Sequence, residues 1–88
     1  MRDKNEFAHD VLDTLRRRRV RFRGCPPTYV ELDLSGAVRV QFAGLRDGRP
    51  WVGRVKFNCN DASERLVMSD PAVVAELCES GIQLMQAD

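Results

Sequence analysis

The sequence predicts a single small α+β domain over residues 1–88, with two helices covering one face of a mainly antiparallel sheet of three to five strands. Three observations carry this prediction. Apolar residues recur at four-residue spacing near the start, as on one face of a helix. Three central segments, residues 29–34, 38–42 and 51–57, alternate apolar and polar residues, as half-buried strands do. A proline-initiated helical pattern then begins at Asp70-Pro71. The expected order is α-β-β-β-(β)-α-β.

The first helix is expected from about Lys4 to about Arg18. Phe7, Val11 and Leu15 follow one another at four-residue spacing and form a single apolar stripe. The last turn is rich in arginine, which suits the negative end of the helix dipole. This helix should therefore pack its stripe on the sheet and expose its other faces.

The second hairpin is predicted to have a two-residue turn at Asp47-Gly48. This turn places Val40 opposite Val55 and Val38 opposite Phe57, so the apolar residues of both strands share one face. The turn chemistry and the alternation therefore agree on one register.

The first hairpin requires a different connection. A two-residue Ser35-Gly36 turn would put Leu32 opposite Arg39, on the wrong face. A three-residue connection or a bulge pairs Leu34 with Val38 and restores one apolar face. That register predicts two rows on the outer face of the sheet: Asp33, Arg39 and Lys56 in one, and Glu31, Gln41 and Arg54 in the next.

The last third of the chain is expected to hold the second helix, from Asp70-Pro71 to Ser80-Gly81, where glycine favours a helix end. A short strand is predicted over residues 65–68. Residues 82–85 are expected to form a last edge strand or a tail packed on the sheet. The predicted core face of the helix carries Val73, Val74 and Leu77.

Composition excludes several classes of protein. A hydrophobic content of 43% and a charged content of 31% argue against a disordered chain. No apolar run approaches the roughly 20 residues of a membrane span. The charged first six residues lack the apolar core of a secretion signal, so a cytoplasmic protein without membrane contact is expected.

The three cysteines, Cys25, Cys59 and Cys78, lack the close spacing of a metal site. A zinc site that combines them with His9 would draw four scattered ligands from the whole chain, and we set it aside. Reduced, mostly buried thiols are expected instead. No cofactor or metal is predicted.

Catalytic residues are also not evident. His9 and Asp13 stand four residues apart on the first helix and can form a hydrogen bond, but no Ser/His/Asp set, paired-carboxylate site or phosphate-binding glycine loop accompanies them. The protein is therefore not expected to be an enzyme.

Charge is strongly polarised along the chain. Residues 1–24 carry a net charge of +4, residues 25–60 carry +2 and residues 61–88 carry −5. Opposite charge at the two ends permits contact between copies, so a monomer and a homodimer stay open alternatives.

The basic charge concentrates in residues 16–23, which contain six arginines. Guanidinium groups bind phosphate and carboxylate by paired hydrogen bonds, so this run predicts a docking surface. Whether the run is helical or extended stays open, as does its neutralisation by the acidic third of the chain. The predicted partner-binding residues are Arg16, Arg17, Arg18, Arg19, Arg21, Arg23, Arg39 and Arg54.

The helix–three strands–helix order resembles the topology of double-stranded-RNA-binding domains. In that family the second helix opens with a lysine-rich phosphate clamp, whereas residues 60–71 are acidic here. The outer sheet face offers one aromatic residue, Tyr29, which makes a poor platform for stacking bases. An Arg-x-x-x-Arg pair followed by Asp61-Ala62-Ser63 is similar to the PilZ cyclic-dinucleotide motif, but Leu66 replaces its final glycine.

These observations favour a non-catalytic, stoichiometric binding protein. It would be an adaptor, regulator or inhibitor of the kind that phages and mobile elements direct against a host, and it would dock on a protein or ribonucleoprotein through its arginines. The alternative is a DNA- or RNA-binding module that contacts the phosphate backbone through Arg16–Arg23.

Overall fold

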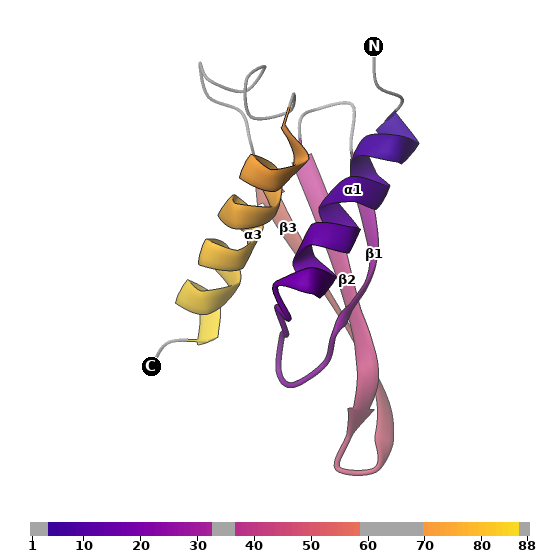
Figure 1. Ribbon diagram of the computed structural model, residues 1–88. Helices are drawn as coiled ribbons and strands as arrows, with labels where there is room; N and C mark the ends of the chain where they lie inside the picture. The colour runs from indigo at the N-terminus through magenta and orange to yellow at the C-terminus, as the bar shows by residue number, and fades with distance from the viewer. Residues whose placement is uncertain (1–3, 33–36, 59–69, 87–88) are drawn as a thin grey trace.

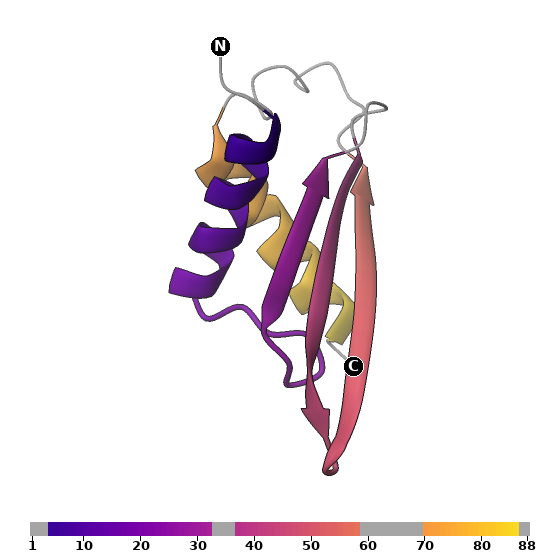
Figure 2. The same ribbon diagram turned by 90° about the vertical axis from the view of Figure 1, so that its right-hand side faces the viewer.

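The computed structural model describes residues 4–32, 37–58 and 70–86 and confirms the predicted fold class. The sheet is antiparallel in the order β1-β2-β3, and both helices lie on one of its faces while the other face stays open (Figure 1, Figure 2). The elements are α1 (Lys4–Arg17), β1 (Pro27–Leu32), β2 (Ala37–Arg46), β3 (Arg49–Asn58) and α3 (Pro71–Gln86).

The two helices run in the same direction, so both N-termini lie at one end of the molecule and both C-termini at the other (Figure 1). The core lies between the helices and the sheet. It includes the predicted stripe of α1 and the predicted inner positions of β2, which are all buried. The largest fully buried side chains include Phe42, Leu15, Ile82, Val11, Val38, Val40 and Val74.

The second hairpin confirms its predicted register. Val40 pairs with Val55 and Val38 with Phe57, and the turn residues Asp47 and Gly48 have φ angles of 53° and 77°. Positive φ at both positions is typical of the type I′ turn, whose twist matches that of the flanking strands. The turn therefore joins β2 and β3 in one uninterrupted ladder, from Arg46 opposite Arg49 to Ala37 opposite Asn58.

The first hairpin has the predicted parity but a different register. Val38 pairs with Leu32, two residues earlier on β1 than the predicted Leu34. Alternation fixes which face a residue occupies and leaves a shift of two residues undetermined. The observed register pairs Val30 with Val40, both buried in the core. Leu34, Ser35 and Gly36 lie outside the described residues, whereas Ala37, the last residue of the predicted three-residue turn, is the first residue of β2.

This shift changes which β1 residues join the cross-strand rows on the outer face of the sheet. Arg39 stands opposite Glu31 and Gln41 opposite Tyr29, so the predicted rows were wrong in their β1 member. The observed rows are Glu31, Arg39 and Lys56, and next to it Tyr29, Gln41 and Arg54.

Helix α3 differs from its prediction in length and in orientation. It continues through Ser80-Gly81 to Gln86, so residues 82–85 are helical and form no strand or sheet-packed tail. Glycine at position 81 makes room for an aromatic ring, since a Cβ atom there would lie 2.5 Å from Cε1 of Phe57. The predicted strand at 65–68 lies outside the described residues.

The buried face of α3 consists of Val74, Ala75, Cys78 and Ile82. Val73 and Leu77, which were predicted to face the core, are exposed. Only Val74 of the predicted core face is therefore confirmed. No helix in the described ranges is long and apolar enough to cross a membrane.

Candidate binding surface

The arginine run begins as the C-terminal end of α1. The N–H of Arg19 donates to the carbonyl of Arg16 at 3.0 Å, and the N–H of Val20 donates to the carbonyl of Leu15 at 3.1 Å. Arg19 has a φ of 54°. This is the Schellman motif, in which glycine usually holds the left-handed position. Val20 and Leu15 occupy the two positions of its usual apolar contact, and both are buried in the core.

The chain then forms a tight turn. The N–H of Phe22 donates to the carbonyl of Cys25 and the N–H of Cys25 donates back to the carbonyl of Phe22, both at 3.0 Å. Arg23 and Gly24 between them have φ angles of 51° and 81°. The run is thus helical to Arg17 and forms a compact loop after it. It is neither helical throughout nor extended.

The end of α3 holds this loop in place. The Gln86 side chain accepts a hydrogen bond from the N–H of Arg23 at 2.7 Å and donates one to the carbonyl of Arg21 at 3.2 Å. Because the bonds join backbone to side chain, they fix the loop while leaving both guanidinium groups exposed.

Aromatic and cation–π contacts join the loop to the β2–β3 hairpin. The Arg23 guanidinium lies 5.4 Å from the centre of the Phe22 ring, and the Phe22 and Trp51 ring centres are 6.0 Å apart. The Arg46 guanidinium lies 5.5 Å from the Trp51 ring centre on the hairpin. Two cation–π contacts thus enclose an aromatic pair, and the partly buried Trp51 serves both the core rim and this surface.

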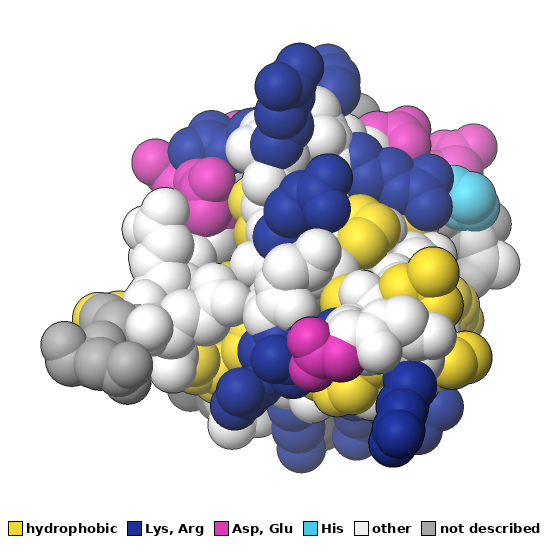
Figure 3. Space-filling view, turned by 90° about the horizontal axis from the view of Figure 1, so that it is seen from below, with side chains coloured by type: hydrophobic (Ala, Val, Ile, Leu, Met, Phe, Trp, Pro, Cys, Tyr) yellow, Lys and Arg dark blue, Asp and Glu magenta, His cyan; other side chains and the backbone are white. Residues whose placement is uncertain are grey.

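We call the exposed arginines gathered here the basic end. Figure 3 views this end of the molecule from below and shows Lys and Arg side chains spread over it, with hydrophobic side chains between them. Within the described part of the chain, none of its five guanidinium groups forms an ion pair. The basic end comprises Arg19, Arg21, Arg23, Arg46 and Arg49.

Two members, Arg46 and Arg49, were missed by the sequence prediction. They are cross-strand partners that flank the Asp47-Gly48 turn. The predicted hairpin register already placed them together at its tip, so that signal was available.

Three other predicted arginines make side-chain contacts within the chain, and so does Arg21 of the loop, whose Nη1 donates to the carbonyl of Gly24 at 3.2 Å. Arg18 forms an ion pair with Glu79 of α3, and its Nε donates to Oε1 at 3.0 Å. The hydrogen bond and the charge of Glu79 raise the pKa of Arg18 above its usual value. Arg16 donates from Nε to the carbonyl of Pro27 at 3.2 Å, and Arg17 donates to the Thr14 hydroxyl at 3.2 Å. The acidic third therefore neutralises part of the run.

The last two predicted arginines lie on the open face of the sheet. Arg39 and Arg54 line a hollow of about 470 Å³ together with Tyr29, Glu31, Val40 and Gln41. Nε of Arg54 donates to the Gln41 side-chain oxygen at 3.2 Å. The eight predicted residues thus divide between a loop, internal contacts and the outer sheet face.

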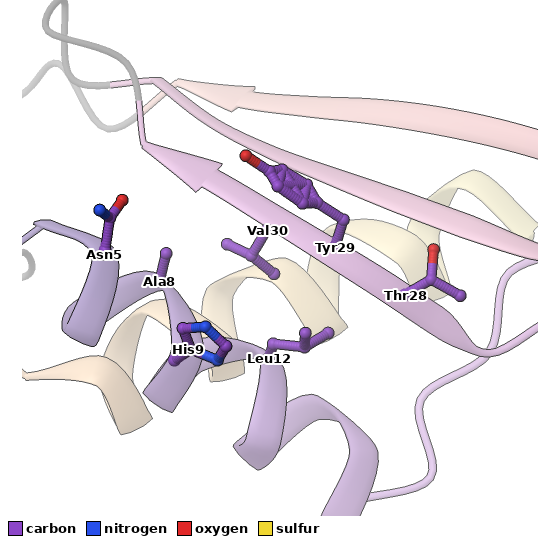
Figure 4. Close-up of a pocket in the computed structure, with 7 residues that line it drawn as sticks. All are labelled: Asn5, Ala8, His9, Leu12, Thr28, Tyr29 and Val30. Atoms are coloured by element: carbon purple, nitrogen blue, oxygen red, sulfur yellow. The ribbon is translucent and has the colours of Figure 1, made fainter.

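A groove between α1 and β1 contains the single histidine. Its volume is about 280 Å³, with Ala8, His9 and Leu12 of α1 on one side and Thr28 and Val30 of β1 on the other (Figure 4). Among the described residues, no carboxylate lines this groove. In the described ranges, no group of three or more His, Cys, Asp or Glu residues could hold a metal ion, and Cys25 and Cys78 are buried and unbridged.

The N-terminus of α3 is already occupied by a carboxylate. Asp70 accepts a hydrogen bond from the N–H of Ala72 at 2.9 Å and caps the helix. Asp70 lines a hollow between the two helices together with Asp10, Asp13 and Arg17 of α1. Three carboxylates at this place disfavour the phosphate clamp of double-stranded-RNA-binding domains. Comparisons with protein-family models, curated proteins and solved structures found no match.

Proposed function

We propose that the protein is a non-catalytic binding protein that docks stoichiometrically on a protein or ribonucleoprotein through its basic end. In this role it acts as an adaptor, a regulator or an inhibitor of its partner. The proposal keeps Arg19, Arg21 and Arg23 from the sequence prediction and adds Arg46 and Arg49 of the hairpin. It leaves out the other predicted arginines, which are Arg16, Arg17 and Arg18 with contacts in the chain and Arg39 and Arg54 on the outer sheet face.

The backbone of Arg19 and Arg23 carries this proposal. Both residues have left-handed φ angles, 54° and 51°, which glycine adopts without strain. A side chain in this conformation costs about 1–2 kcal/mol. Both guanidinium groups are exposed and, among the described residues, unpaired with any carboxylate. Arginine at two positions that folding would assign to glycine supports a role in binding an anionic partner.

The aromatic residues of the basic end favour a protein over a nucleic acid. Phe22 packs on Phe42 of the core, with ring centres 5.5 Å apart, and the outward contacts of Phe22 and Trp51 are to arginine. Stacking of bases requires free ring faces. The exposed Leu45 beside the hairpin tip offers an apolar contact of the kind found at protein interfaces.

Direct binding of DNA or RNA is the second candidate. Five exposed guanidinium groups without a carboxylate partner in the described chain would suit a phosphate backbone as well as acidic side chains. The two candidates predict different behaviour in salt.

Capture experiments with two charge-matched variants test the proposal. The loop variant replaces Arg19, Arg21 and Arg23 with glutamine, and the sheet variant replaces Arg39, Arg54 and Lys56 with glutamine. We expect the loop variant to lose the partner that wild-type protein captures from its native cells, and the sheet variant to keep it. Equal capture by wild type and a folded loop variant would rule out the basic end.

A nuclease treatment and a salt series then separate the two candidates. A protein interface with a packed centre keeps its partner after nuclease digestion and in raised salt. Binding through phosphate contacts weakens steeply with salt, by several orders of magnitude for six to ten contacts, and disappears with the nucleic acid.

A further inference from the structure

Strand β1 forms one edge of the sheet, since β2 is its only partner strand within the described chain. In an antiparallel ladder, every second residue bonds a given neighbour, and the residues between direct their N–H and C=O groups away from it. The Asp47-Gly48 turn determines which set does which. A two-residue turn is closed by a hydrogen-bonded pair, here Arg46 and Arg49. Even-numbered residues of β2 therefore bond β3, and odd-numbered ones bond β1.

Two hydrogen bonds between β1 and β2 agree with this assignment. The N–H of Ala43 donates to the carbonyl of Pro26 at 3.2 Å. The carbonyl of Gln41 accepts a bond from the Thr28 hydroxyl at 3.3 Å. Both β2 groups belong to odd-numbered residues, so the bonding sides of β2 are as the turn requires.

The outward-facing backbone groups of β1 follow directly. Tyr29 and Glu31 pair with odd-numbered residues of β2, so they bond that strand. Val30 and Leu32 alternate with them and turn their N–H and C=O groups toward the edge. Among the described residues, none bonds these groups. Such an edge is a template for a further strand.

The groove between α1 and β1 lies along this edge (Figure 4). It touches both the exposed Tyr29, on the outer sheet face, and the buried Val30, on the inner face, so it reaches around the strand. Ala8 and Leu12 of α1 form its apolar side. Its volume is about 280 Å³. A closed apolar cavity of roughly 150 Å³ already holds benzene, so the groove has room for an apolar side chain.

The lining of the groove indicates what it can hold. Helix α1 closes against the start of β1, where Arg16 donates to the carbonyl of Pro27 at 3.2 Å. Among the described residues that line the groove, none is a lysine, arginine, aspartate or glutamate. The site therefore suits neither a phosphate nor a charged side chain. An extended peptide satisfies the edge groups of β1 and brings apolar side chains to the groove at every second residue.

We propose that the edge of β1 binds an extended segment of a partner protein, which adds a strand to the sheet and seats an apolar side chain against Ala8 and Leu12. Main-chain bonds to Val30 and Leu32 hold the segment, and the groove selects the side chain that stands opposite Val30. This site is separate from the basic end and does not rest on the function proposed for it.

Amide hydrogen exchange, followed by NMR on the full chain, is the first measurement. The probes are short peptides selected on the protein from a random library. Saturating peptide should slow exchange at Val30 and Leu32 by at least about tenfold, and Tyr29 and Glu31, which already bond β2, should change little. If no selected peptide protects Val30 and Leu32, the proposal is wrong. Protection that grows with protein concentration alone would assign the edge to a second copy and also overturn it.

Methylating the peptide backbone nitrogens one at a time tests strand pairing without altering the protein. Binding should weaken about tenfold where the peptide N–H bonds β1, and much less at the residues between, which gives a period of two. A loss without this period would show that the peptide is not held as a strand.

A groove variant tests the seat of the side chain. Ala8→Gln places a longer polar side chain in the groove and should weaken peptide binding by at least about tenfold. Ala72→Gln makes the same change at an exposed position of α3 and is the matched control. Thermal melting by circular dichroism verifies that both variants fold, and the methylation series decides if Ala8→Gln does not. Full binding by a folded Ala8→Gln protein would contradict the proposal. The loop variant of the basic end should bind the peptide like wild type, so the two proposed surfaces can fail separately.

Discussion

Helices α1 and α3 pack side by side on the same sheet, yet they use their surfaces differently. The apolar stripe of α1 is wholly buried, and its remaining faces are polar. Helix α3 buries Val74, Ala75, Cys78 and Ile82 while it exposes Val73, Leu77 and Leu84. An apolar pattern selects the buried face of a helix only when the opposite face is polar. The tertiary packing, and not the pattern alone, orients α3.

Truncating one leucine in each helix should give the largest difference between α1 and α3 in lost free energy of unfolding. Leu15→Ala in α1 removes a fully buried side chain and should lower the free energy of unfolding by about 2–5 kcal/mol. Leu84→Ala in α3 should change it by less than about 0.5 kcal/mol, because this side chain is exposed. Urea unfolding of both variants at low protein concentration measures the contrast. Similar losses for the two would show that α3 is not open on this face.

A second experiment examines how α3 meets the sheet. Replacing glycine with alanine inside a helix usually raises the free energy of unfolding by about 1 kcal/mol. Gly81→Ala should give no such gain, because the new Cβ atom displaces the Phe57 ring. In a Phe57→Ala background the same substitution should recover that gain. A double-mutant cycle in urea should therefore give a coupling of about 1 kcal/mol. A coupling near zero would mean that the ring moves aside freely.

Glycine substitutions near the C-terminal ends of the two helices should change the free energy of unfolding by smaller amounts, with opposite sign in α1 and α3. Arg19→Gly should raise the free energy of unfolding by about 0.5–1 kcal/mol, because glycine relieves the left-handed backbone at the end of α1 but loses more conformational entropy on folding. Gln83→Gly, inside α3, should lower it by a similar amount. Thermal or urea unfolding measures both. Loss of stability in Arg19→Gly would show that this arginine is kept for folding, and the proposed binding role would lose its main support.

The ion pair between Arg18 of α1 and Glu79 of α3 should contribute least to the stability of the fold. Glu79→Gln should lower the melting temperature slightly, and Glu76→Gln should lower it less, because only Glu79 bonds Arg18 directly. The raised pKa of Arg18 means that the folded state favours its charged form, so the contribution of the charged Arg18–Glu79 pair is lost as the pH rises into strong alkali. Salt should shrink the difference between wild type and Glu79→Gln. An unchanged melting temperature in low salt would assign the pair no role.

The two hairpins show how far the sequence determines a register. In the second hairpin the Asp47-Gly48 turn and the alternation both specify the pairing, so every predicted pair is present. In the first, alternation alone was available, and it cannot distinguish Leu32 from Leu34 as the partner of Val38. A single local signal therefore fixes the face of a strand, and a second signal is required to fix its position.

The candidate site was predictable in part. The density of arginine identified the loop, but the sequence could not show which side chains have internal partners. Arg18 meets Glu79 across 61 positions of sequence, and the Phe22–Trp51 contact depends on two distant turns. The end of α3 was misplaced for a similar reason, since Gly81 ends no helix and instead accommodates Phe57 of β3. Long-range packing decided each of these points.

The parallel course of the helices has a practical consequence for handling the protein. Lys4 begins α1 at the end remote from the arginine loop, whereas Gln86, the last residue of α3, bonds that loop directly (Figure 1). A fusion tag or surface linker attached at the N-terminus leaves the arginines accessible. One attached after α3 would sit beside them, so immobilisation through the N-terminus is the orientation that presents this surface to an analyte.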